Sequence, residues 1–352
     1  MTHAYGPRLE RVHRALKAAA CLVDPLHPLG IRARSLLPAA TGLSPQNVEL
    51  CLRECLEIAP SDAELRALCC TTPEVPAAHV LLSANVFVGA HRAIAVGLAA
   101  SELVSVRPSR REPQMTELLR EAGAPFRIVE ELRPSAGDHV WAYGSDETLR
   151  SVRSALPSAV TLHAHGSGFG VAVVSASSPP ELEAAASALA RDVVPFDQRG
   201  CLSPRVALVS GNFETARRLA EALVAHLARF EEQVPRGELS ADERAAERRY
   251  RDLAAYSGEL FAGTRYAVSL RAETPGEPLL VPPVGRNVHV VSTADVGAPL
   301  DAMRDAVTAV GVFGADSLRD RLLSLMPAAR VSALGCMQRP PLDGPVDRRT
   351  FL

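Results

Sequence analysis

The chain has 352 residues, which is long for a single hydrophobic core and predicts two α/β lobes with a cleft between them. Hydrophobic residues make up 47% of the sequence and charged residues 22%, a balance typical of a globular protein rather than of a disordered or coiled-coil chain. The formal net charge of -2 excludes a general basic field for nucleic acid or an anionic membrane, so any anionic ligand must be bound by local groups.

The N-terminus and the cysteines indicate the compartment. Residues 1–10 lack the basic start and the apolar core of a signal peptide, and no apolar stretch long enough to span a membrane follows. We therefore expect a cytoplasmic protein with no membrane span. The seven cysteines include no C-x-x-C pair, so the sequence predicts neither a metal site nor a disulfide framework.

The predicted elements begin with helices and continue as alternating strands and helices. Residues 9–68 carry apolar side chains three and four positions apart, and Ser44 followed by Pro45 is typical of a helix start. Strands are then expected at residues 79–88, 102–108, 126–129, 139–142, 160–162 and 169–174, and helices at residues 113–122, 144–155 and 180–191. This alternation predicts a mostly parallel sheet with covered faces.

The second half of the chain continues the same pattern. Strands are expected at residues 205–209, 287–291 and 331–334, and helices at residues 215–230, 240–256 and 300–325. Ser240 and Glu243 have the spacing of a capping box. The G-x-G-x-G at residues 166–170 lies between two short predicted strands, and we interpret it as a tight turn rather than a dinucleotide fingerprint.

One cysteine stands in a setting that suits chemistry. The segment PFDQRGCLSPRVALV places Cys201 between a glycine and a predicted strand, with Arg199 and Arg205 close in sequence. A nearby positive charge lowers the pKa of a thiol and raises its thiolate fraction, so we expect Cys201 to be a nucleophile. Most of the other cysteines have the pattern of small buried hydrophobic residues.

The FDQxxCLSPR pattern around Cys201 resembles the nucleophile segment of the long-chain acyl-CoA reductases of bacterial bioluminescence, an offshoot of the aldehyde dehydrogenase superfamily. The segment SANVFVGAHRAIAVGLAASELVSVRPSRREP is similar to the superfamily pattern of an asparagine after a strand, then a helix, a strand and a Lys-Pro-Ser turn. Asn85 and the tripeptide Arg107, Pro108 and Ser109 stand at those positions.

Two further segments carry the same resemblance. In WAYGSDETLR, Gly144 and Ser145 resemble the Gly-Ser that lets a helix N-terminus approach the cofactor in this superfamily. The C-terminal RVSALGCMQRPPLDG is similar to the ending of the reductase family, with an Arg, a Gly-x-Met and a later acidic residue before a glycine. Together the matches span residues 80–344.

The resemblance implies an aldehyde dehydrogenase-like fold, with two Rossmann-like lobes of mostly parallel sheet. We expect an N-terminal helical segment (1–75), a nucleotide-binding lobe (76–195), a catalytic lobe (196–335) and a C-terminal tail (336–352). It also implies reduction of an acyl-CoA thioester to the aldehyde, through a covalent acyl thioester on Cys201. The expected partners are an acyl-CoA or a related acyl donor, and either a second copy of the chain or an acyl-supplying enzyme.

The resemblance also assigns catalytic roles. The side-chain amide of Asn85 and the backbone N–H of Cys201 would stabilise the oxyanion, although a buried asparagine that caps a strand end is the alternative interpretation. Aldehyde-oxidising members have a glutamate that activates water where TLHAHGSG has His163 and His165. Without this glutamate we do not expect activation of water, and its absence suits a reductase. His163 or His165 is a candidate proton donor, or else a histidine without chemistry.

Arginines at the turn after residue 106 predict the cofactor. Arg107 stands where the superfamily's lysine holds the adenosine ribose. Arg110 stands at about the position where NAD-preferring members have a carboxylate that repels a 2′-phosphate. These residues favour NADP(H), while a solvated basic turn is the alternative. The Glu-x-Phe-Gly-Pro segment of the superfamily is not found, so a catalytically degenerate scaffold stays open, as does reduction of an acyl phosphate. Acyl chain length and oligomeric state are not determined by the sequence.

Overall fold

The computed structural model describes residues 6–274 and 276–349, which divide into two compact units. The first unit contains the chain up to Ser167 together with Pro341–Val346, and the second contains Gly168–Pro340 together with Asp347–Arg349. No helix in these described ranges has both the length and the apolar character needed to cross a membrane.

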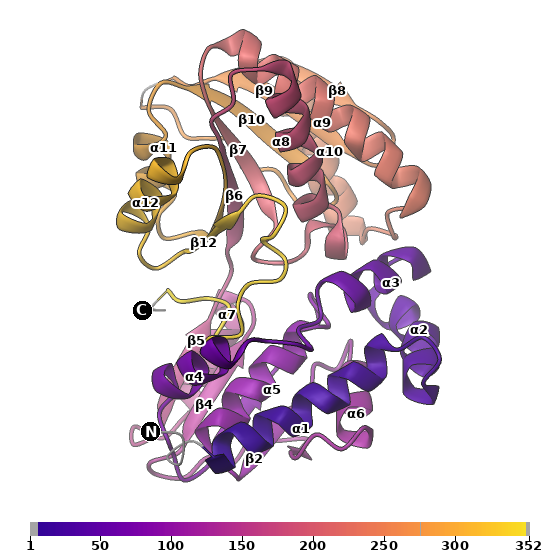
Figure 1. Ribbon diagram of the computed structural model, residues 1–352, viewed down its shortest axis with the longest axis vertical. Helices are drawn as coiled ribbons and strands as arrows, with labels where there is room; N and C mark the ends of the chain where they lie inside the picture. Colours follow the sequence, from indigo (N-terminus) through magenta and orange to yellow (C-terminus); the bar gives the residue numbers. More distant parts are fainter. Residues whose placement is uncertain (1–5, 275, 350–352) are drawn as a thin grey trace. The chain divides into compact units, whose positions relative to one another are not determined.

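Four helices open the first unit, as the apolar spacing predicts. They are α1 (Gly6–Val23), α2 (Pro28–Thr41), α3 (Pro45–Glu54) and α4 (Asp62–Thr71). Ser44 caps α3, because its hydroxyl oxygen accepts a hydrogen bond from the backbone N–H of Asn47 at 3.1 Å. Helix α1 packs along α5, as Figure 1 shows, and buries Val12, Ala15 and Ala19. This layer covers α5 on its side away from the sheet.

The first sheet is parallel throughout, with the strand order β3-β2-β1-β4-β5. Its strands are β1 (Ala78–Leu81), β2 (Val104–Arg107), β3 (Arg127–Ile128), β4 (His139–Tyr143) and β5 (Thr161–His165), joined by helices α5 (Gly89–Ala100), α6 (Gln114–Glu121) and α7 (Asp146–Ala155). Gly97 lets α5 approach closely, since a Cβ there would lie 3.2 Å from side-chain atoms of Val80 and Val104. Leu149 of α7 packs on the opposite face.

The second sheet has seven strands in the order β12-β11-β6-β7-β10-β9-β8, and only the β8–β9 pair is antiparallel. The strands are β6 (Phe169–Val174), β7 (Pro204–Ser210), β8 (Glu259–Ala262), β9 (Ala267–Ala272), β10 (Asn287–Thr293), β11 (Val307–Phe313) and β12 (Arg330–Ala333). The central strands β6, β7 and β10 are largely buried, and β6 (FGVAVV) is accordingly a continuous apolar run in the sequence.

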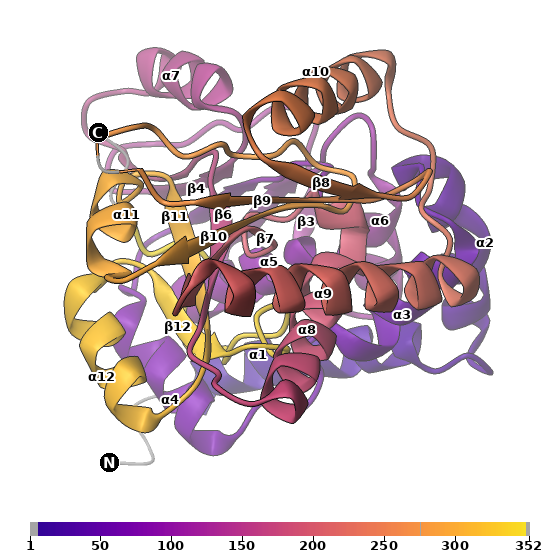
Figure 2. The ribbon, with the colours of Figure 1, turned by 90° about the horizontal axis from the view of Figure 1, so that it is seen from above.

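Helices cover both faces of the second sheet. They are α8 (Pro179–Val193), the short turn η1 (Pro195–Gln198), α9 (Phe213–Gln233), α10 (Ala241–Ser257), α11 (Gly297–Ala302) and α12 (Asp316–Leu325). Figure 2 shows α9 and α10 on opposite sides of β8 and β9. Leu300 of α11 and Leu322 of α12 complete a core with valines of β6, β7 and β11. Ser240 and Glu243 form the expected capping box of α10.

The structure corrects two of the expected elements and adds a hairpin. The strand expected at residues 79–88 ends at Leu81, because Leu81 pairs with Arg107, the last residue of its neighbour β2. Residues 300–325 are not helical throughout, since the buried run Val307–Phe313 is strand β11 and a buried run lacks the alternation that marks a strand. The hairpin of β8 and β9 was not expected.

The division of the chain also differs from the expected one. The short strands on either side of the glycine-rich turn at residues 166–170 belong to different sheets, with β5 in the first and β6 in the second. Strand β6 pairs with β7 and β11, so the second unit begins at Gly168 and not at residue 196. Residues 341–346 of the expected C-terminal tail belong to the first unit.

Candidate active site

The carboxyl ends of β1, β2 and β4 carry the residues expected to meet the nucleotide. Asn85 lies in the loop between β1 and α5, Arg107 is the last residue of β2, and Gly144 follows β4. These strands are parallel neighbours, so the three positions share one edge of the first sheet. The order of the strands reverses at β1 and β4, which is where open α/β sheets bind ligands.

Asn85 is exposed to solvent. The alternative interpretation, a buried asparagine that caps a strand end, is therefore wrong. Phe87, two residues further along the loop, is the side chain that enters the core at 1% exposure. An exposed amide at the carboxyl edge of the sheet has donors to offer a ligand.

The arginine turn after β2 is also accessible. Arg107 is half-buried and Arg110 is exposed, and neither forms an ion pair within residues 6–274 and 276–349. Glu112 has a different place: it is buried, and its Oε1 accepts a hydrogen bond from the backbone N–H of Met115 at 2.7 Å at the start of α6. Burial raises the pKa of Glu112 to about 7. A nucleotide at this turn would therefore meet the arginines rather than Glu112.

Gly144 and Ser145 lead into α7 as expected. The hydroxyl oxygen of Ser145 accepts a hydrogen bond from the backbone N–H of Thr148 at 3.2 Å, so Ser145 is the N-cap of the helix. Asp146 and Glu147 place two carboxylates in the first turn. These charges already interact favourably with the positive end of the helix and oppose a further anion. Gly144 and Ser145 would therefore let a ligand come close to the backbone, but the start of α7 does not favour binding of the ligand's pyrophosphate.

The two histidines lie on β5 in the first unit. His163 Nε2 is 2.9 Å from His139 Nδ1, and its ring stacks on that of Trp141 with centroids 4.6 Å apart. The pKa of His163 is lowered to about 4, first by burial and then by the neighbouring His139 and His165. His163 is therefore neutral at pH 7 and bound to its neighbours, an arrangement that does not favour the expected proton transfer.

In the second unit the chain reaches Cys201 through a turn in the left-handed region of φ/ψ space. Phe196, Asp197 and Gln198 have φ values of 56°, 49° and 65°. Such a conformation costs about 1–3 kcal/mol for a residue other than glycine, so the surroundings must stabilise it. All three side chains are at most 1% exposed. The FDQ part of the motif therefore packs into the protein and shapes the turn.

Gln198 joins this turn to two strands of the second sheet. Its side-chain amide donates to the carbonyl oxygens of Pro204 and Asn287, each at 2.7 Å. Its Oε1 accepts a hydrogen bond from the backbone N–H of Asn287 at 2.8 Å. The carboxamide thus bonds to the first residues of β7 and β10, and Cys201 follows three residues later at the amino edge of the sheet.

The environment of Cys201 corrects the expectation about its thiol. Cys201 is partly buried, and burial raises the pKa of the thiol to about 12. The carboxylate of Asp347 also contributes to this increase, whereas Arg349 and Arg330 act against it. The expectation that nearby arginines lower this pKa overall is wrong, because the loss of hydration outweighs the charges.

The two arginines close to Cys201 in sequence have different surroundings. Arg199 Nε donates to Glu243 Oε1 at 3.0 Å, so its charge is already paired. Arg205 on β7 has a buried Nε without a hydrogen-bond partner among the described residues. Burial lowers the pKa of the Arg205 guanidinium, and the Cys201 sulfur raises it. Of these two arginines, Arg205 is the one that interacts electrostatically with the thiol.

The Gly-x-Met of the C-terminal segment packs beside the nucleophile turn. Met337 is 1% exposed and fills the space left by two glycines, since a Cβ on Gly170 would lie 2.8 Å from its Cε. A Cβ on Gly170 would also lie 2.3 Å from the carbonyl oxygen of Leu202, next to Cys201. Asp192 of α8 accepts a hydrogen bond from the backbone N–H of Met337 at 2.9 Å. Asp192 has no motif of its own in the sequence, because its partner lies 145 residues away.

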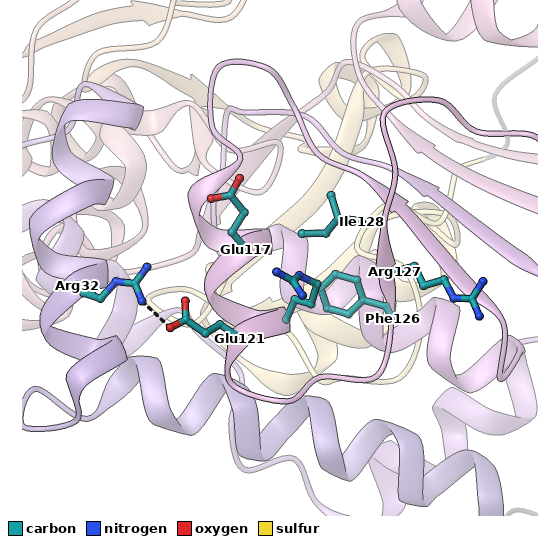
Figure 3. Close-up of a pocket in the computed structure, with 7 residues that line it drawn as sticks. Arg32, Glu117, Glu121, Phe126, Arg127 and Ile128 are labelled. Carbon is teal, nitrogen blue, oxygen red and sulfur yellow. Dashed lines mark hydrogen bonds and ion pairs between the residues drawn. The ribbon is translucent and has the colours of Figure 1, made fainter.

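A surface pocket of the first unit is lined by other residues. Figure 3 shows Arg32 of α2, Glu117 and Glu121 of α6, and Phe126 beside β3 around it. Arg32 Nη1 and Glu121 Oε1 form an exposed ion pair at 2.6 Å. None of the expected site residues lines this pocket. This hollow is therefore not part of what the expected residues form in either unit.

Solved structures identify the class of fold. An oxidoreductase from Marinobacter aquaeolei is 14% identical, with a TM-score of 0.70 over 94% of this chain and 79% of that one. A NAD-dependent benzaldehyde dehydrogenase from Corynebacterium glutamicum is 15% identical, with a TM-score of 0.65 over 94% of this chain and 81% of that one. A lactaldehyde dehydrogenase is 14% identical, with a TM-score of 0.66 over 95% and 79% of the two chains. The chain thus has the aldehyde dehydrogenase fold, as expected.

The family follows from the sequence model that matches the chain. The model of the acyl-CoA reductase (LuxC) family matches residues 127–347, more than half of the chain, and includes Cys201 and the C-terminal segment. The chain belongs to this family of oxidoreductases. Asn85 and the arginine turn precede the matched range. No curated protein matches the chain.

Proposed function

We propose that this protein reduces an acyl-CoA thioester to the aldehyde with NADPH, through an acyl thioester on Cys201. The observation that carries the proposal is that the acyl-CoA reductase family model spans the turn that bears Cys201. The structure supports it with a left-handed turn whose buried side chains bond to the starts of β7 and β10. A buried, shaped turn suits a residue whose reacting atom must be held in place.

Cys201 carries the chemistry in this proposal. Its sulfur forms a bond to the acyl carbonyl carbon, the C–S bond to coenzyme A breaks, and the coenzyme leaves as its thiol after taking up a proton. After reduction, Cys201 holds a thiohemiacetal, whose collapse breaks the bond to sulfur and releases the aldehyde. The Cys201 thiol must lose its proton for the first step, and Arg330 and Arg349 favour the thiolate that results.

Asn85 is proposed to stabilise the oxyanion of the tetrahedral adducts. Its exposed side-chain amide is a hydrogen-bond donor, and the backbone N–H of Cys201 would be the second donor, following the superfamily pattern. One donor of this kind contributes about 3–4 kcal/mol to stabilising the transition state in other acyl-transfer enzymes.

A reduced nicotinamide would supply the hydride. The residues proposed to hold this cofactor are Arg107, Pro108, Ser109 and Arg110 after β2, with Gly144 and Ser145 before α7. Arg110 is exposed, and Glu112, which could otherwise bond to a free ribose hydroxyl, is buried at the start of α6. This arrangement fits a 2′-phosphate, and so NADPH, better than it fits NADH.

The proposal is tested by trapping the acyl-enzyme. The protein is incubated with a long-chain acyl-CoA without NADPH, and its intact mass is measured. We expect one acyl group on Cys201, which disappears when NADPH is added and an aldehyde forms. Cys201→Ala should give no adduct, whereas Cys336→Ala, which removes an exposed cysteine, should give the same adduct as the native protein. An adduct on another residue, or none, would overturn the proposal.

A further inference from the structure

The turn before Cys201 contains the most deeply buried ion pair in the described residues of the second unit. The side chains of Asp197 and Arg286 are both 0% exposed. Arg286 donates to Asp197 Oδ1 from Nη2 at 2.9 Å and from Nε at 3.2 Å. The second carboxylate oxygen of Asp197 accepts a hydrogen bond from the backbone N–H of Gly237 at 2.9 Å. Both charges are therefore compensated away from water.

The backbone of the turn is also bonded to the segment that contains Arg286. The carbonyl oxygen of Asp197 accepts a hydrogen bond from the backbone N–H of Gly285 at 3.0 Å. Arg286, the next residue, has a φ of 65°, so the segment that supplies the guanidinium is itself in the left-handed region. Arg286 Nη1 also donates to Glu231 Oε2 at 2.9 Å, which ties the pair to α9. Two unusual backbone segments are thus joined by one ion pair.

This arrangement fixes the course of the chain shortly before Cys201. Residues 196–198 in the left-handed region reverse the chain, and Gln198 then bonds to β7 and β10. Cys201, three residues after Gln198, is left partly buried at the amino edge of the sheet. A turn without the ion pair would be free to relax to ordinary backbone angles, and the thiol would then gain water.

We infer that Asp197 and Arg286 are positioning residues for Cys201, because they hold the left-handed turn that shields the sulfur and fixes its place. The inference rests on the proposed role of Cys201 as nucleophile. It assigns the pair two opposite effects on reactivity: it slows reaction of the sulfur with small reagents, and it speeds attack on a bound acyl donor. Neither residue touches the substrate in this role.

The test compares two reactions of the same sulfur in Asp197→Asn, a change that keeps the shape of the side chain but removes its charge. In a background lacking Cys336, alkylation of Cys201 by iodoacetamide at pH 7.5 should become at least fivefold faster. Single-turnover acylation by a long-chain acyl-CoA should become at least tenfold slower. The KM for NADPH should not change, because the cofactor is proposed to bind in the first unit.

The matched control is Glu247→Gln, which removes a buried carboxylate whose ion-pair partners are Arg236, 2.7 Å away, and Arg251, 3.2 Å away, rather than Asp197 or Arg286. Its alkylation and acylation rates should equal those of the native protein. If Asp197→Asn does not fold, Arg286→Lys, which keeps the charge but loses the paired donors, should show the same opposite changes. Unchanged rates in a folded variant, or two rates that fall together, would overturn the inference.

The experiment separates this inference from the proposed function. Alkylation requires only the thiol, so it reports on the turn even if the native protein forms no acyl-enzyme. In that case the proposed function fails, and faster alkylation of Asp197→Asn still supports the shielding role of the pair, whereas unchanged alkylation overturns it.

Discussion

The carboxyl edge of the first sheet and the nucleophile turn of the second unit are built in opposite ways. Asn85, Arg110 and Ser145 at the first are exposed, whereas Asp197 and Gln198 at the second are fully buried. A group that recognises a ligand from solution keeps its donors accessible, while a group that aims a reacting atom is itself immobilised. Substitutions of the exposed residues should therefore change binding, and substitutions of the buried residues should change reactivity.

The largest expected effect concerns the ionisation of Cys201. With a pKa of about 12, the thiolate fraction, and with it the alkylation rate, should rise about tenfold per pH unit from pH 7 to pH 10, a thousandfold in all. The measurement is the rate of iodoacetamide labelling of Cys201 by peptide mass spectrometry in a Cys336→Ala background. A plateau below pH 9 would show that the turn does not shield the sulfur.

Asn85→Ala should lower turnover about a hundredfold or more, the usual cost of removing an oxyanion donor. Because Asn85 is exposed, its loss should leave the unfolding midpoint in urea almost unchanged. Steady-state kinetics with an acyl-CoA and NADPH measure the first effect. Unchanged turnover would remove Asn85 from the site and leave the exposed edge with a binding role only.

Arg110→Glu should reverse the choice of cofactor. The arginine can form a charge-assisted hydrogen bond to a 2′-phosphate, worth about 1.5–3 kcal/mol, which corresponds to roughly a tenfold to hundredfold change in relative affinity. Arg111→Glu is the matched control, because Arg111 is also exposed and lies one residue further along. Calorimetric titration with NADPH and NADH gives the ratio. Equal effects of the two substitutions would mean that only the general charge of the turn matters.

The smallest effect is expected at Ser145. Ser145→Ala removes the cap of α7 and should destabilise the protein by about 1 kcal/mol in urea unfolding. Ser44→Ala removes the equivalent cap of α3 and serves as the control for stability alone. If Ser145 also contacts the nucleotide, only Ser145→Ala should raise the KM for NADPH. A KM that stays at the native value would limit Ser145 to its capping role.

The sequence could predict those parts of the structure that depend on neighbouring residues. The caps at Ser44 and Ser240 were predicted because a cap needs only the residues two or three positions further along. The alternation of apolar runs with amphipathic segments predicts mostly parallel sheet, which both sheets of the structure are. The order of four short motifs predicted the family, which the family model confirms.

Elements whose surroundings come from distant segments could not be predicted in the same way. The sequence predicts a helix where β11 lies, because this strand is buried on both faces and so lacks a period of two. The sequence does not predict the division after Ser167, because two strands separated by a short glycine-rich turn are usually neighbours in one sheet. Only their pairing assigns β5 and β6 to different sheets.

That Cys201 follows an FDQ segment and has arginines close to it can be seen in the sequence alone. The contacts of those residues depend on the folded protein. Arg286, which binds Asp197 from 89 residues away, has no motif of its own in the sequence. The raised pKa of Cys201 likewise depends on burial, which many distant segments produce together and no short segment contains. Charge and spacing are local properties, whereas loss of hydration and backbone strain depend on the folded whole.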